Sequence, residues 1–448
     1  MNWITFAENS ISEYISAVDF NVDSYYSTGF LDVSETISEL SYLTHDYFRY
    51  YGKFPSKVAK YIIETMVAEK VITPAADFVF DNYNGSGTTM VEAKIAGFSS
   101  GGIDINPFGV LAANVKTFNY DVGKLQSLFN TITQKLDSVF CEEPQQTLFL
   151  LDTHENTTDI SDIDQVCRQM YIDFPDIEKW FDKDVIYQLS AIKHIVLQLP
   201  RDEYREFFAL VFFAIIRRVS KAHDAEVRPH VNPKKRKRNA IEAFTKKASE
   251  MIATMGSWNT VTSDRVESHT YICDNSDAVN VTNTLNRLRN RYKKDLGLVI
   301  SHPPYLNCFD YIPVYRLKFL WAFGFDEIYG DLNYQQIKGE ELKSYPASTD
   351  RLVNNYFQHN YDAYKAIYDN LKPGGYCCVV IGDCTINTQL FSVHKMIIKM
   401  MEAIGFTCEK VTYRSTSYGL GRYAYKHKAD YNDKEDGKKD AILFFKKA

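Results

Sequence analysis

Two short segments far apart in the chain have the residue types and spacing to do chemistry. The first is the glycine-rich turn Asp81-Asn82-Tyr83-Asn84-Gly85-Ser86-Gly87-Thr88-Thr89. The second is Ser301-His302-Pro303-Pro304-Tyr305, a rigid Pro-Pro turn that ends in an aromatic ring. A glycine turn after a strand lets the backbone approach a nucleotide-like ligand closely. The Pro-Pro turn offers a free carbonyl and a flat ring to a planar substrate. Together the two segments predict a cofactor site and a substrate site at two strand ends.

The acidic residues around the glycine turn limit which cofactor it could bind. Asp104 ends the next expected strand, where a carboxylate can accept hydrogen bonds from both hydroxyls of a ribose. The turn is not a G-x-G-x-x-G motif, and no Lys follows it as in a phosphate-binding loop. Because Asp81 and Asp104 would repel a phosphate, S-adenosylmethionine fits better, since it has an ammonium, a sulfonium and a ribose but no phosphate. The alternative is that Gly85 and Gly87 serve only a tight strand-to-helix turn.

The elements that must position these residues alternate between strand and helix. Strand patterns at 78–81 and 99–104 are followed by helical patterns at 88–96 and 107–116, and strand patterns return at 296–300 and beyond. This order predicts an α/β fold, with a parallel, Rossmann-like sheet that has helices on both faces. Long amphipathic helices and few strand signals separate the two halves. The expected parts are a helical N-terminal extension, a cofactor-binding half, a helical insertion and a catalytic half, at 1–40, 41–120, 121–255 and 256–448.

Composition limits the class of protein. The 448 residues carry a net charge of −6, so any binding to nucleic acid must come from a local basic patch. The eight cysteines form no C-x-x-C pair, which argues against a zinc site, and we expect no bound metal. Reduced thiols indicate a cytoplasmic protein. No signal-peptide pattern and no apolar run of about 18 residues is seen, so we expect no membrane association.

The glycine turn resembles the cofactor motif of the DNA amino-methyltransferases, the enzymes that methylate exocyclic amines of cytosine or adenine. The usual form of that motif has Pro-Phe where this chain has Asn82-Tyr83. The segment 45–55 is similar to the one that packs over the methionine part of the cofactor, and 102–107 to the ribose-binding strand end. The resemblance covers 41–120 and 270–448. It implies that the cofactor is S-adenosylmethionine and that these residues bind it: Lys53, Phe54, Asp81, Asn84, Gly85, Gly87, Thr88, Asp104, Asn106 and Asp274.

The Pro-Pro-Tyr turn is similar to the catalytic motif of the same family. An exocyclic amine is a poor nucleophile until hydrogen-bond acceptors orient it, and a target base must leave the duplex to reach the site. By this resemblance the Pro303 carbonyl is one acceptor, Pro304 keeps the turn rigid and Tyr305 stacks on the base. His302 replaces the usual Asp, Asn or Ser, and a neutral imidazole can accept a hydrogen bond whereas an imidazolium cannot. A plain surface turn is the alternative.

Asn307 and Asp310 follow the Pro-Pro-Tyr turn, and either the base pocket or the cap of the next helix could use them. The wider sequence context of the turn is closer to the cytosine group of the family. We therefore expect a site-specific DNA methyltransferase that favours N4 of cytosine over N6 of adenine. Three alternatives remain open: adenine as the target, an RNA base methyltransferase, and a catalytically impaired nucleic-acid-binding protein.

A basic run in the expected insertion is the candidate nucleic-acid contact. It consists of Lys234, Lys235, Arg236, Lys237 and Arg238. Phosphate contacts by such residues would give salt-sensitive binding that does not read sequence. The alternatives are a solvated charge run and a nuclear localisation signal. We expect DNA as the partner, with RNA second, in a bacterial or archaeal cytosol, and partner subunits of a restriction-modification or defence system remain open.

Overall fold

The computed structural model describes residues 1–140, 160–306, 311–325, 350–386, 389–414 and 440–448. Among these residues, eight strands form one sheet in the order β1-β9-β10-β6-β5-β2-β3-β4, and β7 and β8 pair separately. The strands are β1 Ser27–Leu31, β2 Asp77–Asp81, β3 Ser100–Asp104, β4 Ser268–Ile272, β5 Asp295–Ser301, β6 Tyr376–Gly382, β7 Cys384–Ile386, β8 Gln389–Phe391, β9 Phe406–Arg414 and β10 Asp440–Lys447. Every neighbouring pair in the large sheet is parallel except the two pairs made by β10.

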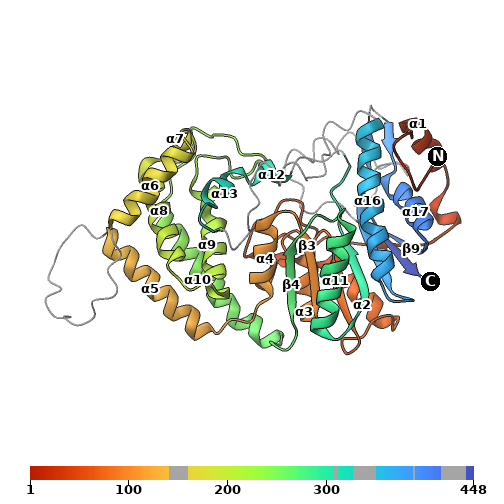
Figure 1. Ribbon diagram of the computed structural model, residues 1–448, viewed down its shortest axis with the longest axis horizontal. Coiled ribbons are helices and arrows are strands. Elements are labelled where there is room, and N and C mark those ends of the chain that lie inside the picture. The colour runs from red at the N-terminus through yellow and green to blue at the C-terminus, as the bar shows by residue number, and fades with distance from the viewer. Residues whose placement is uncertain (141–159, 307–310, 326–349, 387–388, 415–439) are drawn as a thin grey trace.

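Helices cover both faces of the sheet and form a second part beside it (Figure 1). The α-helices that contact the sheet are α2 Ser56–Ala68, α3 Thr88–Ile95, α4 Pro107–Thr117, α11 Ala278–Tyr292, α16 Asp350–Asn370 and α17 Val393–Ile404. Those of the second part are α5 Val122–Phe140, α6 Ile160–Asp173, α7 Ile177–Trp180, α8 Lys183–Leu197, α9 Glu203–Val219 and α10 Ala240–Val261. The remaining helical elements are α1 Ile11–Ala17, η1 Val22–Ser24, η2 Glu39–Ser41, η3 Leu43–Asp46, α12 Tyr311–Val314 and α13 Arg316–Trp321.

Alternating side chains on the central strands explain the layers. Phe78 and Phe80 of β2 pack with α11, α16 and α17, whereas Val79 between them packs with α2. Apolar side chains on both faces of the strands are typical of a parallel sheet buried between helices. From β2 the chain adds β3 and then β4 on one side of the sheet, and it then crosses back to add β5 on the other side of β2. In open α/β sheets, ligands bind at such a point, beyond the carboxyl ends of the strands. The predicted fold class is confirmed.

The N-terminal segment differs from the helical extension that we expected. It contains one short helix, α1, and a strand, β1, that pairs in parallel with β9 at the edge of the sheet. Phe6 and Tyr14 are fully buried in the core formed with α16 and α17. These two aromatic residues are therefore core residues of the sheet part, whereas Tyr25 and Phe30 of the same segment are exposed.

The second part is helical, and its extent differs from the 121–255 that we expected for an insertion. Helix α10 continues to Val261, and residues 311–325 return from the Pro-Pro-Tyr turn to pack on α9. Trp321 lies edge-on to Phe181 and Phe212 in this core. Side chains of the segment after the Pro-Pro-Tyr turn therefore belong to the core of the helical part, and Figure 1 shows α13 beside the helices of that part. No helix in the described ranges is long and apolar enough to cross a membrane.

Candidate active site

One cavity brings the two sequence segments together. It lies at the carboxyl ends of β2, β3, β4 and β5, and its empty space, including the open mouth, is about 950 Å³, within the range of small-molecule sites. The predicted residues that line it are Lys53, Phe54, Asn84, Gly85, Thr88, Asp104, Asn106, Asp274, His302 and Pro304. Asp81, Gly87, Pro303 and Tyr305 do not line it. The glycine turn and the Pro-Pro turn thus share one cavity wall.

The glycine turn adopts a backbone that only glycine tolerates well. Gly85 and Gly87 have φ values of +51° and +81°. A Cβ on Gly87 would lie 2.7 Å from the Cβ of Ala113 on α4, so a side chain at position 87 would also collide with that helix. The Gly85 backbone N–H donates to the Asp104 carboxylate over 2.7 Å. The turn is therefore tied to the end of β3 and to the helix that follows it.

Asp81 has a different place from the one that we expected. It is fully buried, and its carboxylate accepts hydrogen bonds from Thr89 Oγ1 at 2.5 Å and from the Tyr83 backbone N–H at 2.9 Å. Burial raises the pKa of Asp81 to about 7, against the effect of these two hydrogen bonds. The Asp81 carboxylate therefore joins the glycine turn to the first residues of α3, and Asp81 does not line the cavity.

Three ionisable residues of the cavity wall set its charge. Asp104 accepts from the Gly85 and Asn106 backbone N–H groups, and burial raises its pKa to about 6. Asp274 accepts from the Ser276 backbone N–H at 2.8 Å and from its hydroxyl at 2.9 Å. Lys53 donates to the His45 carbonyl, and burial lowers its pKa to about 8. Two carboxylates and one ammonium suit a zwitterionic ligand better than a phosphate.

Amide side chains in the same wall have unmet hydrogen-bonding capacity. The Asn82 amide donates to Asn275 at 3.3 Å, and the Asn84 amide donates to the Gly85 carbonyl. Within the described part of the chain, Asn82 Oδ1, Asn84 Oδ1 and Asn275 Nδ2 are buried and have no partner. Because an unpaired buried polar atom is costly, these groups indicate a wall built for a polar ligand.

The Pro-Pro turn begins directly at the end of β5. His302 lies between two rings: its centroid is 5.0 Å from that of Phe54 and 5.3 Å from that of Tyr305. Burial, with a smaller effect from the Arg414 charge, lowers the pKa of His302 to about 3. The imidazole is therefore neutral at neutral pH and has one nitrogen free to accept. Its Nε2 is buried and without a partner among the described residues.

The two proline carbonyls of the turn are not equivalent. The Pro304 carbonyl accepts a hydrogen bond from the Tyr356 hydroxyl at 2.8 Å, from helix α16. This contact fixes the turn and leaves the Pro303 carbonyl as the candidate acceptor for a substrate. Tyr305 turns away from the cofactor cavity, and its ring lies against the end of β6. Asn307 and Asp310 lie outside the described residues.

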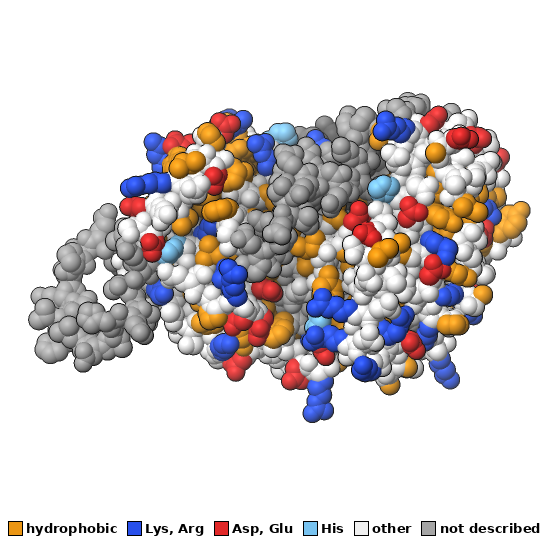
Figure 2. Space-filling model, in the orientation of Figure 1, with side chains coloured by type: hydrophobic (Ala, Val, Ile, Leu, Met, Phe, Trp, Pro, Cys, Tyr) orange, Lys and Arg blue, Asp and Glu red, His pale blue; other side chains and the backbone are white. Residues whose placement is uncertain are grey.

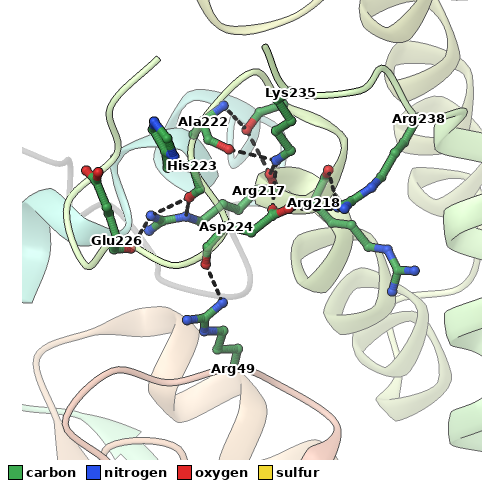
Figure 3. Close-up of polar contacts among 10 residues, drawn as sticks. Arg49, Arg217, Arg218, Ala222, His223, Asp224, Glu226, Lys235 and Arg238 are labelled. Atoms are coloured by element: carbon green, nitrogen blue, oxygen red, sulfur yellow. Dashed lines mark hydrogen bonds and ion pairs between the residues drawn. The ribbon is translucent and has the colours of Figure 1, made fainter. Parts of the chain in front are cut away.

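The basic run is partly structural. Lys235 is nearly buried, and its ammonium donates to the carbonyls of Arg217 and Ala222 and to the Asp224 carboxylate (Figure 3). Arg238 pairs with the same carboxylate at 3.1 Å, and Lys237 pairs with Asp184. Lys234 and Arg236 are exposed. Only part of the run can therefore reach a phosphate, and Lys235 holds the loop together instead.

The loop 220–232 in front of the basic run is folded around one arginine. Arg217 on α9 donates to the carbonyls of His223, Glu226 and Val227. Arg49, which directly precedes Tyr50 of the cavity wall, donates to the Asp224 carbonyl at 2.7 Å (Figure 3). The loop is thereby docked beside the segment that reaches the cavity. On the face drawn in Figure 2, Lys and Arg side chains are interspersed with Asp and Glu, so that face has no broad positive surface.

Comparisons with known proteins find sequence similarity to methyltransferases over parts of the chain. The chain is 27% identical over 184 residues to the Type II methyltransferase M.MvaI of Kocuria varians, which covers 41% of this chain and 36% of that protein. It is 34% identical over 91 residues to the Type II methyltransferase M.MjaII of Methanocaldococcus jannaschii, covering 20% of this chain and 16% of that protein. The chain is thus similar to these Type II methyltransferases over the matched segments. Each match spans about a third or less of the length of these curated relatives.

Two other comparisons add no functional argument. No protein-family model matches the chain. Among solved structures, the rRNA methyltransferase aviRa from Streptomyces viridochromogenes is similar over 88% of this chain and 86% of its own, with a TM-score of 0.30 and 9% identity. A similarity this low says nothing about substrate.

Several cavity residues were missed from the sequence. Tyr50 lines the cavity, packs with its ring tilted against that of Tyr315 and lies beside Gly85, yet it was not selected although Lys53 and Phe54 of the same segment were. Asn275 follows Asp274 directly, so adjacency was a usable signal. His359 comes from the middle of α16, and a lone histidine in a long helix gives no such signal.

Proposed function

We propose that this protein transfers a methyl group from S-adenosylmethionine to an exocyclic amine of a base in DNA. N4 of cytosine is favoured over N6 of adenine because of the sequence around the Pro-Pro turn. The observation that supports the proposal most is the single cavity lined by both Asp104 and His302. The names of the relatives, Type II methyltransferases, agree with it.

The wall of the cavity fits the proposed cofactor. S-adenosylmethionine supplies a methyl group on a positively charged sulfonium, and it also has an amino acid end, a ribose and an adenine. Lys53 offers a cation to its carboxylate, Asp104 offers acceptors to the ribose, and Asp274 offers one to the adenine amine. The unpaired amide atoms of Asn82 and Asn84 give further polar contacts at the turn.

The Pro-Pro turn supplies the groups that would orient the target amine. The nitrogen lone pair of such an amine is delocalised into the ring, and two acceptors on its N–H groups help the nitrogen become tetrahedral. The Pro303 carbonyl and the neutral imidazole of His302 are those acceptors. Because the pKa of His302 is lowered to about 3, the side chain is a weak base, so it acts as a hydrogen-bond acceptor. The methyl group would pass from sulfur to nitrogen, the cofactor would leave as the neutral thioether, and the proton that the amine loses would go to solvent.

The first experiment measures transfer from tritiated S-adenosylmethionine to unmethylated bacterial genomic DNA and to total RNA, followed by nucleoside analysis of the product. Methylated cytosine or adenine in DNA is the expected result. Label in RNA alone would refute the DNA assignment. Absence of label with intact cofactor binding would favour a catalytically impaired binding protein.

His302 variants test the acceptor. His302→Ala should lower transfer by roughly 10²- to 10³-fold, as for removal of one preorganised catalytic hydrogen-bonding group, with cofactor affinity unchanged. His302→Asn keeps an acceptor oxygen at this position and should restore a measurable part of the rate. Equal rates for His302→Ala and the wild type would show that the acceptor is another group.

A further inference from the structure

A row of three residues crosses the sheet next to the Pro-Pro turn. Gly382, the last residue of β6, pairs with Asp440, the first of β10, and Asp440 pairs on its other side with Arg414, the last of β9. Strand β6 is the parallel neighbour of β5, which leads into the turn. The row therefore lies at the same edge of the sheet as His302 and Tyr305.

Tyr305 reaches across to this row. The Arg414 guanidinium donates to the Tyr305 hydroxyl over 3.1 Å and pairs with Asp440 Oδ2 at 3.1 Å, and the hydroxyl itself lies 3.4 Å from that same oxygen. A Cβ on Gly382 would collide with the Tyr305 ring and the Asp440 carboxylate. The absence of a side chain at 382 thus lets the ring and the carboxylate lie against the strand backbone.

The ion pair in this row is buried. The Arg414 side chain is 7% exposed and that of Asp440 is 9% exposed. Removing two charges from water is expensive, and a buried pair adds little net stability compared with apolar residues of the same size. A buried pair can instead favour one arrangement of its surroundings. Here the Tyr305 hydroxyl contacts both members of the pair.

The same contacts extend to the acceptor. The Tyr305 ring lies edge-on to His302 at an interplanar angle of 69°, and Phe54 contacts the imidazole as well. Moving the Tyr305 ring would therefore release one side of His302. Arg414 also disfavours a proton on His302, which adds to the effect of burial on the pKa of the imidazole.

We propose that Arg414 and Asp440 are positioning residues for the target base: they hold Tyr305 by its hydroxyl, and through its ring they hold His302. This inference rests on the proposed methyl transfer, because it assigns the pair to the base side of that site. Neither residue lines the cofactor cavity, so neither is expected to bind the cofactor.

Tyr305→Phe is the first test because it removes one oxygen and keeps the ring. Transfer from tritiated S-adenosylmethionine to unmethylated bacterial genomic DNA should fall about tenfold in kcat, the size of one lost charged hydrogen bond, while cofactor affinity stays unchanged. Tyr61→Phe is the matched control, since the Tyr61 hydroxyl accepts from Lys410 of the same strand β9 but its ring packs edge-on to Phe444, whereas the Tyr305 ring packs on His302. Equal kcat for Tyr305→Phe and Tyr61→Phe would overturn the proposal.

Arg414→Met and Asp440→Asn separate positioning from a general loss of stability. Both break the ion pair and should lower kcat. Only Arg414→Met removes the positive charge near His302, so only this variant should raise the pKa of His302, read by NMR of labelled histidine with His302→Asn for assignment. An unchanged His302 titration in Arg414→Met would contradict the coupling. This titration needs no transfer, so it remains decisive if the wild type methylates nothing and the proposed function fails.

Discussion

The two halves of the site are held in place by different kinds of contact. In the proposed cofactor half, backbone N–H groups donate to carboxylates: those of Tyr83 and Asn106 to an aspartate two residues earlier, and that of Gly85 to Asp104 at the end of the next strand. In the proposed catalytic half, the Pro-Pro turn is held by side chains from segments distant in the chain, namely Phe54, Tyr356, Arg414 and Asp440. The cofactor half depends on local backbone geometry, and the catalytic half depends on tertiary packing.

This difference predicts how each half fails. A change of backbone conformation should damage the cofactor half directly, because its donors are main-chain groups. A change in side-chain packing should damage the catalytic half and leave the cofactor half intact. Matched glycine substitutions can separate the two, since Gly87 and Gly382 each allow a close approach in one half only.

The largest effect is expected for Gly87→Ala. Its φ of +81° is strained for alanine, and the new Cβ would lie 2.7 Å from the Ala113 Cβ, so α4 or the turn must move. The free energy of unfolding should fall by more than the ~1–3 kcal/mol of backbone strain alone, and cofactor binding by calorimetry should be lost. Gly97→Ala is the control: its φ is +83° but nothing lies within 4 Å of a Cβ there. Similar losses in both variants would disprove the role of close packing.

The second effect is expected for Gly382→Ala. A methyl group here would displace the Tyr305 ring or the Asp440 carboxylate, and both belong to the catalytic half. Transfer to DNA should fall by roughly tenfold or more, as expected when reacting groups are misplaced. Cofactor affinity should match that of the wild type. Loss of cofactor binding in this variant would show that the two halves are not independent.

A smaller effect, which depends on pH, is expected at Asp104. Its folded pKa of about 6 lies above the ordinary value of an aspartate, so the free site takes up a proton as pH falls through about 6. A ligand that needs the ionised carboxylate should therefore bind more weakly below that pH, by up to about tenfold per unit. Asp104→Asn should bind more weakly at neutral pH and lose this dependence. If the affinity of Asp104→Asn for the cofactor falls with pH in the same way, another group causes the pH dependence.

The sequence predicted the cofactor half better than the catalytic half for this same reason. The Gly-Ser-Gly turn, Asp104 and the strand patterns around them are local signals, and the structure brings Gly85, Ser86 and Asp104 to one cavity. The role of Asp81 in closing the turn was missed because the sequence alone does not show which way a carboxylate at a strand end points. It can face a ligand or accept from a nearby backbone N–H. The Arg414–Asp440 pair was not predictable from spacing, since it depends on the register of β9 and β10.

The smallest effect on transfer is expected in the basic run. From the sequence we assigned all five residues the same role, but in the structure their exposure differs. Lys234→Ala with Arg236→Ala removes two exposed cations, whereas Lys235→Ala removes a nearly buried ammonium that joins Arg217, Ala222 and Asp224. If both exposed cations contact phosphates, the salt dependence of binding to a DNA duplex should fall by about 2 in log–log slope, with an unchanged melting temperature.

Lys235→Ala should lower the melting temperature and change the salt dependence of DNA binding little. Its loss leaves the Asp224 carboxylate without one partner and the loop 220–232 without a brace, so the melting temperature should fall while the charge-dependent slope changes by no more than about 1. Fluorescence anisotropy across a salt series and thermal unfolding measure the two quantities. If the double variant keeps the wild-type slope, the basic run makes no phosphate contact, and nucleic acid must reach the active site over another surface. Arg49 would then be the next residue to test, since it lies between this loop and the cavity.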